Sequence, residues 1–142
     1  LDEQIREVVL SLEKEWTNKN IELDIDLDEV SIRTDKTLLS HVWSNIIGNA
    51  IKYSYDNSKI EIKLRNENDK IKVTIKDYGI GIEEEKIPYI FNKFYQGDTS
   101  HSNEGNGLGL ALVKGIIDLI NGKIEVHSEV NKGTEFIVTL NK

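Results

Sequence analysis

The sequence has no cysteine, no long apolar run and no excess of basic residues. The absence of cysteine excludes a disulfide framework and a thiolate metal site, and it allows a reducing compartment without requiring one. No uninterrupted apolar stretch approaches the roughly 18 residues that a membrane-spanning helix needs, and no signal peptide is visible. The chain itself therefore shows no sign of being membrane-embedded or held together by disulfides.

The charge balance argues against two classes of partner. The formal net charge is −7, whereas nucleic acids and anionic membrane surfaces bind clustered lysine and arginine. A length of 142 residues suits one domain with one core. An apolar content of 38% with 30% charged residues is typical of a soluble globular domain. We therefore expect residues 1–142 to form a single domain that binds no nucleic acid and makes no direct membrane contact.

Hydrophobic periodicity predicts alternating helices and strands. Helices are expected at residues 1 to about 18–20, at 35–51 with Asp35 as N-cap, and at 108–121 with Gly122 in the C′ position. Strands are expected at 21–27, 30–34, 59–65, 71–77, 123–128 and 134–140. A long polar loop at about 83–107 contains one short helix. This order predicts a two-layer α/β sandwich, in which three helices cover one face of a mixed, mostly antiparallel sheet.

The second expected helix has a polar stripe opposite its apolar face. Asn45 and Asn49 lie four residues apart and Lys52 follows three residues later, which places all three on one side. An amide oxygen is a suitable hard ligand for Mg²⁺, and a lysine can meet phosphate as a point charge. The alternative is an ordinary solvated helix face.

The strand at 71–77 ends on an acidic residue. Asp77 has the same parity as three apolar residues of that strand, so its carboxylate is aimed at the interior. A buried charge needs a donor, and the exocyclic amine of a purine would be one. Gly79 and Gly81 would let the backbone turn tightly and approach a flat base. The alternative is a structural aspartate that caps the turn at Gly79.

A second glycine cluster precedes the third expected helix. Gly105, Gly107 and Gly109 lead into an apolar-periodic segment, and the amides at a helix N-terminus favour phosphate. No Lys-Ser/Thr pair follows, so this is not a Walker loop, and no strand precedes it as in a dinucleotide fingerprint. By itself such a helix start often serves packing alone. The histidines lack metal-ligand spacing, and no serine nucleophile motif is present.

Five motifs in this order resemble one family over essentially the whole chain. The segments 45–53 (NIIGNAIKY), 77–81 (DYGIG), 91–95 (FNKFY) and 105–110 (GNGLGL), together with the closing hairpin, match the N, G1, F and G2 boxes and the last hairpin of that family. The chain resembles the catalytic, ATP-binding domain of two-component sensor histidine kinases, of the GHKL ATPase superfamily. The resemblance implies ATP and Mg²⁺ as cofactors and a mobile ATP lid at about 83–106.

The resemblance also implies roles for single residues. Asn49 would coordinate Mg²⁺, while Asn45 and Lys52 would act catalytically beside the triphosphate. Asp77 would accept the adenine amino hydrogen. The remaining implied nucleotide contacts are Tyr53 flanking the nucleotide, Gly79 and Gly81 shaping the adenine pocket, Thr134 near the adenine, and Lys93, Gly105, Gly107, Leu108 and Gly109 toward the phosphates.

The chain departs from the family pattern in two places. Gln96 stands where many members have an arginine that reaches the γ-phosphate, and Lys93 is the candidate substitute. The His-Glu pair of the phosphoacceptor helix is absent, and we expect it on a dimerisation domain upstream of Leu1. The implied reaction is γ-phosphoryl transfer from Mg·ATP to that histidine, with a response regulator as indirect partner. The implied setting is the cytoplasmic side of a membrane-anchored, dimeric sensor.

Three alternatives remain open. One is a free-standing GHKL serine kinase of the anti-sigma type, against which the F box, the closing hairpin and a first helix that looks cut at Leu1 all argue. Topoisomerase-like ATPases generally have a glutamate base where Asn45 stands. From another class, the chain could be a nucleotide-sensing pseudokinase that binds without transferring, for which Gln96 is the one hint.

Overall fold

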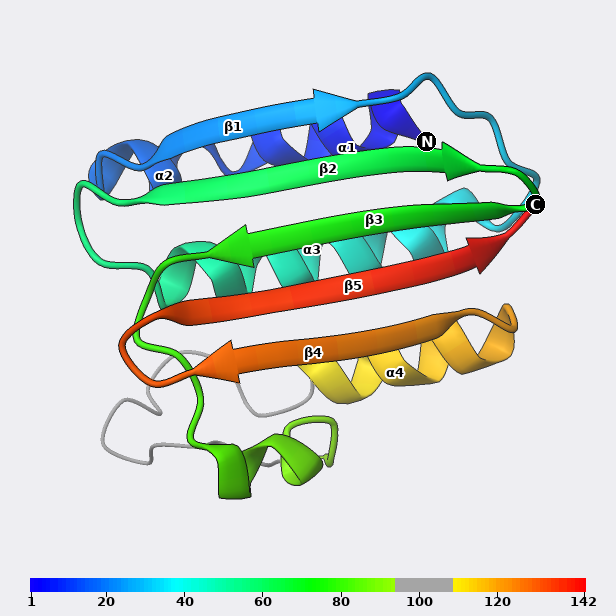
Figure 1. Ribbon diagram of the computed structural model, residues 1–142. Helices are drawn as coiled ribbons and strands as arrows, with labels where there is room; N and C mark the ends of the chain where they lie inside the picture. The colour runs from blue at the N-terminus through cyan, green and yellow to red at the C-terminus, as the bar shows by residue number, and fades with distance from the viewer. Residues whose placement is uncertain (94–108) are drawn as a thin grey trace.

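The computed structural model describes residues 1–93 and 109–142. Five strands form one sheet in the order β1-β2-β3-β5-β4 (Figure 1). The β1–β2 pair is parallel, and the other three pairs are antiparallel. The strands are β1 (Glu22–Leu27), β2 (Lys59–Glu67), β3 (Lys70–Asp77), β4 (Lys123–Glu129) and β5 (Gly133–Asn141).

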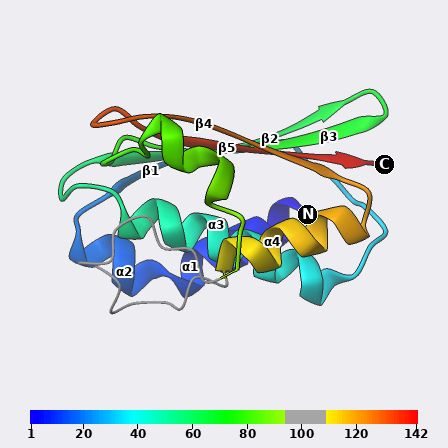
Figure 2. The same cartoon turned by 90° about the horizontal axis from the view of Figure 1, so that it is seen from below.

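The helices lie together on one face of this sheet, as Figure 2 shows. They are α1 (Asp2–Ser11), α2 (Glu13–Asn18), α3 (Lys36–Lys52) and α4 (Gly109–Leu119), and a 3₁₀ helix, η1 (Glu84–Tyr89), contacts β4. The predicted two-layer sandwich with a mixed, mostly antiparallel sheet is therefore confirmed. No helix in the described part of the chain is both long and apolar enough to cross a bilayer. The predicted lid falls partly on residues 94–108, which lie outside the described residues.

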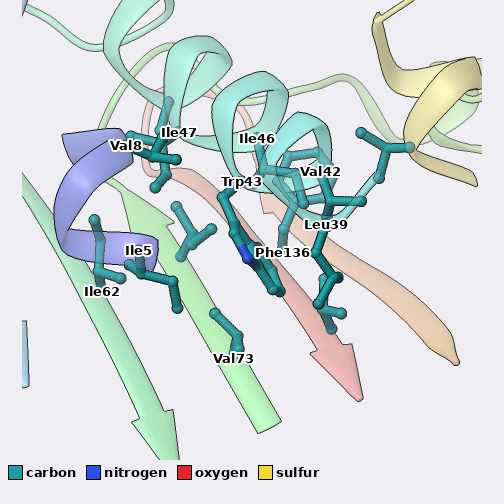
Figure 3. Close-up of a cluster of buried hydrophobic side chains, with 14 of the residues drawn as sticks. Ile5, Val8, Leu39, Val42, Trp43, Ile46, Ile47, Ile62, Val73 and Phe136 are labelled. Carbon is teal, nitrogen blue, oxygen red and sulfur yellow. The ribbon is translucent and has the colours of Figure 1, made fainter. Parts of the chain in front are cut away.

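The core fills the space between α3 and the central strands (Figure 3). Strands β2, β3 and β5 bury alternate residues, as strand geometry requires. Trp43 of α3 is fully buried, and its indole N–H donates to Gln4 Oε1 at 2.9 Å. Gln4 in turn donates to the Lys36 carbonyl at 2.7 Å. The buried polar groups are thus paired, and they join α1 to α3.

The first helix is broken, contrary to the single helix predicted to residue 18–20. Leu12 has φ −102° and ψ 12°, and it separates α1 from α2. The Ser11 hydroxyl donates back to the Val8 carbonyl at 2.6 Å, a bond that bends helices. The Val9 carbonyl accepts from Leu12 N and from the Trp16 indole. These local bonds replace the regular helical pattern at this point.

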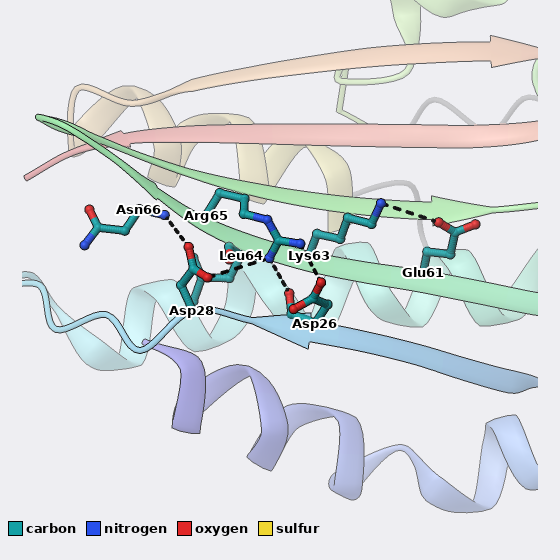
Figure 4. Close-up of polar contacts among 7 residues, drawn as sticks. All are labelled: Asp26, Asp28, Glu61, Lys63, Leu64, Arg65 and Asn66. Carbon is teal, nitrogen blue, oxygen red and sulfur yellow. Dashed lines mark hydrogen bonds and ion pairs between the residues drawn. The ribbon is translucent and has the colours of Figure 1, made fainter.

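The predicted strand at 30–34 is wrong. Val30 is buried, but its backbone N–H donates to the Asp2 carboxylate at 3.1 Å instead of joining a ladder. The preceding strand β1 is therefore the edge of the sheet, and Ile25 on it is 36% exposed. Arg65 of β2 ties this edge on the helix-free face, donating to the Asp26 carboxylate at 2.6 Å and lying 3.9 Å from that of Asp28 (Figure 4).

The residue that terminates α4 also differs from the prediction. Asn121, not Gly122, has the left-handed backbone, with φ 59°. Its N–H donates to the Asp118 carbonyl and that of Gly122 to the Ile117 carbonyl, which is the Schellman pattern with Asn121 at C′. Gly122 lies close to β5, because a Cβ there would be 3.0 Å from the Thr139 carbonyl oxygen, a tight contact.

Candidate functional site

Helix α3, which carries the polar stripe, has a capped N-terminus. The Asp35 carboxylate accepts from Leu38 N at 3.0 Å, which confirms the predicted N-cap. Asn45, Asn49 and Lys52 are half-buried on the side away from the fully buried stripe. The Asn45 amide nitrogen donates to the His41 carbonyl at 2.7 Å. Its Oδ1 faces the start of α4, since a Cβ added to Gly109 would lie 2.7 Å from that atom. Two of the predicted motifs therefore meet here.

Asp77 ends β3 and is only 4% exposed. Its Oδ1 accepts from Gly79 N at 2.9 Å and from Thr134 N at 3.3 Å. Burial raises the pKa of this carboxyl to about 6, against the opposing effect of the two backbone hydrogen bonds. Asp77 does cap the turn at Gly79, as the structural alternative held. Both bonds from described residues end on Oδ1, so Oδ2 remains for another donor.

The loop at 77–82 is wedged between two other segments. A Cβ on Gly79 would lie 2.0 Å from the Tyr53 carbonyl oxygen, and a Cβ on Gly81 would lie 2.1 Å from that of Glu129. Ile80 N donates to the Tyr53 carbonyl at 3.1 Å, and Asn131 N donates to the Ile80 carbonyl at 2.8 Å. These glycines are therefore required by close backbone packing within the protein. The predicted approach to a flat base is a separate role, which this packing leaves open.

Ser128 of β4 is a central residue of this region that sequence reasoning missed. Its hydroxyl accepts from Ile82 N at 2.8 Å and donates to the Gly133 carbonyl at 2.9 Å. It also lies 2.8 Å from the Thr134 hydroxyl, which must then be the donor of that bond. Strand alternation offered a signal, because Ser128 shares the inward parity of Ile124 and Val126.

Several further candidates were expected around the phosphates and the base. Tyr53 is 41% exposed, and the Lys52 ammonium lies 5.3 Å from the centroid of its ring. Lys93 is exposed, and no contact within the described residues links it to the other candidates. Phe91 packs edge-on against Phe136 with centroids 6.4 Å apart, which anchors the segment after η1. The remaining predicted residues, Gly105, Gly107 and Leu108, lie outside the described part of the chain.

Apart from Lys93, the described candidates lie together at one end of the sheet. Asn45 faces Gly109, Tyr53 packs on Gly79, and Asp77 pairs with Thr134 in the β3–β5 register. Figure 1 shows the end of α3, the end of β3 and the start of β5 at this same end of the molecule. The arrangement offers a buried carboxylate beside glycine turns, next to a helix that carries amides and an ammonium. These are the groups that would hold a planar base and an anionic group together.

Comparison with known proteins agrees with this arrangement. Residues 34–142 match the family described as histidine kinase-, DNA gyrase B-, and HSP90-like ATPase. The chain is 37% identical over 138 residues to the signal transduction histidine-protein kinase ArlS of Staphylococcus aureus strain USA300. That alignment covers 96% of this chain and 31% of ArlS, so the chain spans about a third of the length of the curated relatives it matches.

Solved structures extend the similarity to three dimensions. The catalytic domain of histidine kinase ThkA superposes with a TM-score of 0.86 at 31% identity, covering 100% of this chain and 92% of that domain. ThkA in complex with the response regulator TrrA gives 0.81 at 30% identity, over 100% of this chain and 40% of that one. Full-length ShkA in complex with AMPPNP, at 23% identity and TM-score 0.85, supports the fold alone; the match covers 98% of this chain and 29% of ShkA. The chain therefore belongs to the histidine kinase-, DNA gyrase B- and HSP90-like ATPase family, and it is the catalytic ATPase domain of a two-component sensor histidine kinase.

Proposed function

We propose that this domain binds Mg·ATP at the end of α3 and transfers the γ-phosphoryl group to a histidine on a separate phosphoacceptor domain. The observation that carries the proposal is Asp77, a carboxylate that is 4% exposed and uses one oxygen for the protein's own amides. Ionising a buried carboxyl is costly. A ligand donor at Oδ2 would offset that cost.

Adenine fits the chemistry around Asp77. Its exocyclic amine would donate to Oδ2, whereas the carbonyl of guanine at the same ring position would face that oxygen with an acceptor. Thr134, which is 7% exposed, lies opposite Asp77 in the β3–β5 register, and its backbone N–H donates to the Asp77 carboxylate. Gly79 and Gly81 let the loop after β3 pack closely against the Tyr53 and Glu129 backbone. Tyr53 would flank the nucleotide. These residues are the proposed base-binding set.

The phosphates would then lie along the polar stripe of α3. Lys52 would contact phosphate oxygens, and Asn45 would sit beside the triphosphate and its waters. The amides at the start of α4, where Gly109 lies, would face the same anion. Gly105, Gly107, Leu108 and Lys93 remain proposed phosphate contacts. In such transfers the protein contributes mainly positioning and charge stabilisation.

The donor set suits Mg²⁺ held jointly by protein and nucleotide. Among residues 1–93 and 109–142, no three acidic or histidine side chains gather as a ready-made metal site. A cation here would take phosphate oxygens, waters and the amide oxygen of Asn49, which is the coordination that Mg²⁺ commonly has at nucleotide sites. When bound, Mg²⁺ supplies charge neutralisation on the phosphate oxygens.

The partners follow from the same proposal. The sequence has no His-Glu pair of the kind found in the phosphoacceptor helix, so the acceptor would lie on a dimerisation domain of the same parent protein. A response regulator would receive the phosphoryl group from that histidine, in keeping with the ThkA complex with TrrA. We place residues 1–142 as one domain on the cytoplasmic side of a membrane-anchored sensor.

Isothermal titration calorimetry with ATP and GTP tests the base-binding set. Wild-type protein should prefer ATP by a factor on the order of 10⁴, as sites built around a buried polar pair do, and Asp77→Ala should remove most of that preference. Glu67→Ala, which removes an exposed carboxylate at the end of β2, is the matched control. Wild-type binding should also weaken when a chelator removes Mg²⁺. An unchanged preference in Asp77→Ala would refute the assignment.

A further inference from the structure

Lys19 reaches from the end of α2 to the end of a different helix. Its ammonium lies 2.9 Å from the Ile51 carbonyl oxygen, 2.7 Å from that of Lys52 and 3.0 Å from that of Ser54. An ammonium has three hydrogens to donate and no acceptor. All three donors of Lys19 are therefore committed to the C-terminal end of α3.

These bonds complete the end of the helix that carries the proposed phosphate-binding stripe. The last carbonyls of any α-helix lack partners within the helix. In α3 the Asn49 carbonyl accepts from Tyr53 N at 3.0 Å, and the Tyr53 carbonyl accepts from Ile80 N at 3.1 Å. The Lys52 and Ser54 carbonyls accept from Lys19. Lys19 thus fixes the backbone that carries Lys52 and adjoins Tyr53.

The backbone of Lys19 is itself held in place. Its carbonyl accepts from Asn57 N at 2.8 Å, and the Asn20 amide donates to the Asn57 side chain at 2.7 Å. Asn20 and Asn57 both have a left-handed backbone, with φ 52° and 63°. These turns aim the half-buried Lys19 side chain at α3. The bond set therefore belongs to the fold and not to a loosely placed surface lysine.

The electrostatics give this contact a consequence for nucleotide binding. The C-terminal end of a helix carries a partial negative charge of roughly half a unit. The proposed function places a polyphosphate beside that end, where the partial charge would repel it. We propose that Lys19 is a positioning residue for the phosphates of ATP, an inference that rests on the proposed function. Its ammonium offsets the helix end and holds Lys52 in place without touching the nucleotide.

This role differs from that of an ordinary helix cap in a measurable way. A cap that only stabilises the fold, when weakened, affects all ligands of the folded domain equally or not at all. A residue that offsets charge beside the phosphates affects ATP and leaves adenosine unchanged, because adenosine has no phosphate. Comparing ATP with adenosine therefore distinguishes a positioning residue from a structural helix cap.

The experiment uses Lys19→Gln, which keeps two N–H donors and removes the charge, together with Lys19→Arg, which keeps the charge. Lys14→Gln is the matched control, because Lys14 is an exposed lysine on the same helix α2. Dissociation constants for Mg·ATP and adenosine are measured by NMR titration of each variant, and circular dichroism verifies folding. Lys19→Gln should weaken ATP binding about three- to tenfold. Adenosine binding should stay within about twofold, and Lys19→Arg should stay close to wild type.

Equal weakening of ATP and adenosine in Lys19→Gln, or unchanged ATP binding, would overturn the inference. If Lys19→Gln does not fold, the ratio of the ATP and adenosine dissociation constants is measured in Lys19→Arg instead. The positioning role requires the ATP affinity of Lys19→Arg to remain near the wild-type value, and a loss of that affinity would overturn the inference. Wild-type protein that binds neither ligand would contradict the proposed function itself. If instead the wild type and Lys19→Gln bind ATP equally well, only the role of Lys19 is rejected and the proposed function stands.

Discussion

Asp77 shows how the burial of one carboxyl lowers the stability of the folded domain at neutral pH. Burial raises the pKa of its carboxyl from the ordinary value of 3.8 to about 6. The folded state therefore holds the proton more tightly than the unfolded state does. The stability that this proton contributes is fully present below about pH 4 and is lost as the pH rises to about 6. At neutral pH the domain keeps a buried charge that an uncharged residue would avoid.

Asp77→Asn should therefore stabilise the folded domain at pH 8 by about 1–3 kcal/mol. The amide oxygen can still accept from Gly79 N and Thr134 N, and no charge is buried. The same variant should bind ATP less tightly, because an NH₂ group replaces Oδ2. Urea denaturation between pH 4 and pH 8 tests this, and the stability difference should grow from pH 4 to pH 6 and then level off. A difference that does not change with pH would refute the account of Asp77.

At this scale the sequence predicted inward positions better than contacts. Parity alone predicted the burial of Asp77, and this residue is buried. The sequence predicts that Gly79 and Gly81 let the backbone approach a purine base. Their immediate neighbours in the structure are the Tyr53 and Glu129 carbonyls. Ser128 and Lys19 were missed altogether. Periodicity gives the face of an element on which a residue lies, whereas the residue's partner depends on chain segments distant in sequence.

At the scale of elements, the β4–β5 hairpin holds the loop that follows β3. Asn131 in its turn donates its backbone N–H to Ile80 and accepts from the Tyr55 hydroxyl at 2.9 Å. Ser128 bonds the Ile82 amide and the Thr134 hydroxyl on the strand itself. The hairpin therefore sets the position of the proposed base-binding loop relative to α3.

Ser128→Ala should lower the free energy of unfolding by about 1–3 kcal/mol, because the part-buried Ile82 amide loses its acceptor. Hydrogen exchange of the Ile82 amide should accelerate more than that of Ile75 in the middle of β3. Ser31→Ala, on an exposed segment, is the control and should change neither quantity. Unchanged exchange at Ile82 would show that this hydroxyl does not hold the loop.

Element boundaries were predicted well where local chemistry defines them. The Asp35 cap is confirmed, and the strands expected at 59–65, 71–77 and 134–140 are present as β2, β3 and β5. The break at Leu12 was not foreseen, because the apolar repeat continues through it to Trp16. At the end of α4, the left-handed residue is an asparagine next to the glycine that was expected to adopt this conformation. Asparagine tolerates the left-handed conformation as well, so the presence of a glycine does not by itself identify the C′ residue.

At the scale of the whole molecule, the domain is one layer of helices on one sheet, with the proposed site at one end. The sheet face without helices carries charged pairs such as Arg65 with Asp26. The family assignment and the fold identify the catalytic ATPase domain of a sensor histidine kinase. The sequence motifs sufficed for this conclusion because they follow each other in family order.

The chain should therefore phosphorylate a purified histidine-bearing dimerisation domain in trans while hydrolysing ATP slowly by itself. Radiolabelled γ-phosphate should appear on the acceptor in an acid-labile, alkali-stable form, as expected for phosphohistidine. An acceptor with its histidine replaced by glutamine is the control and should remain unlabelled. Acid-stable label would indicate a serine kinase, and binding without any transfer would indicate a nucleotide-sensing module.

The buried indole of Trp43 gives the molecule a built-in spectroscopic probe. The chain has only two tryptophans, and Trp43 is fully enclosed on the side of α3 that faces the sheet. Its emission reports the packing of α1 on α3 and is shielded from quenching by a ligand on the opposite side of that helix. With Trp16 replaced by phenylalanine, any change in this fluorescence upon adding nucleotide would register a rearrangement of the helix layer itself.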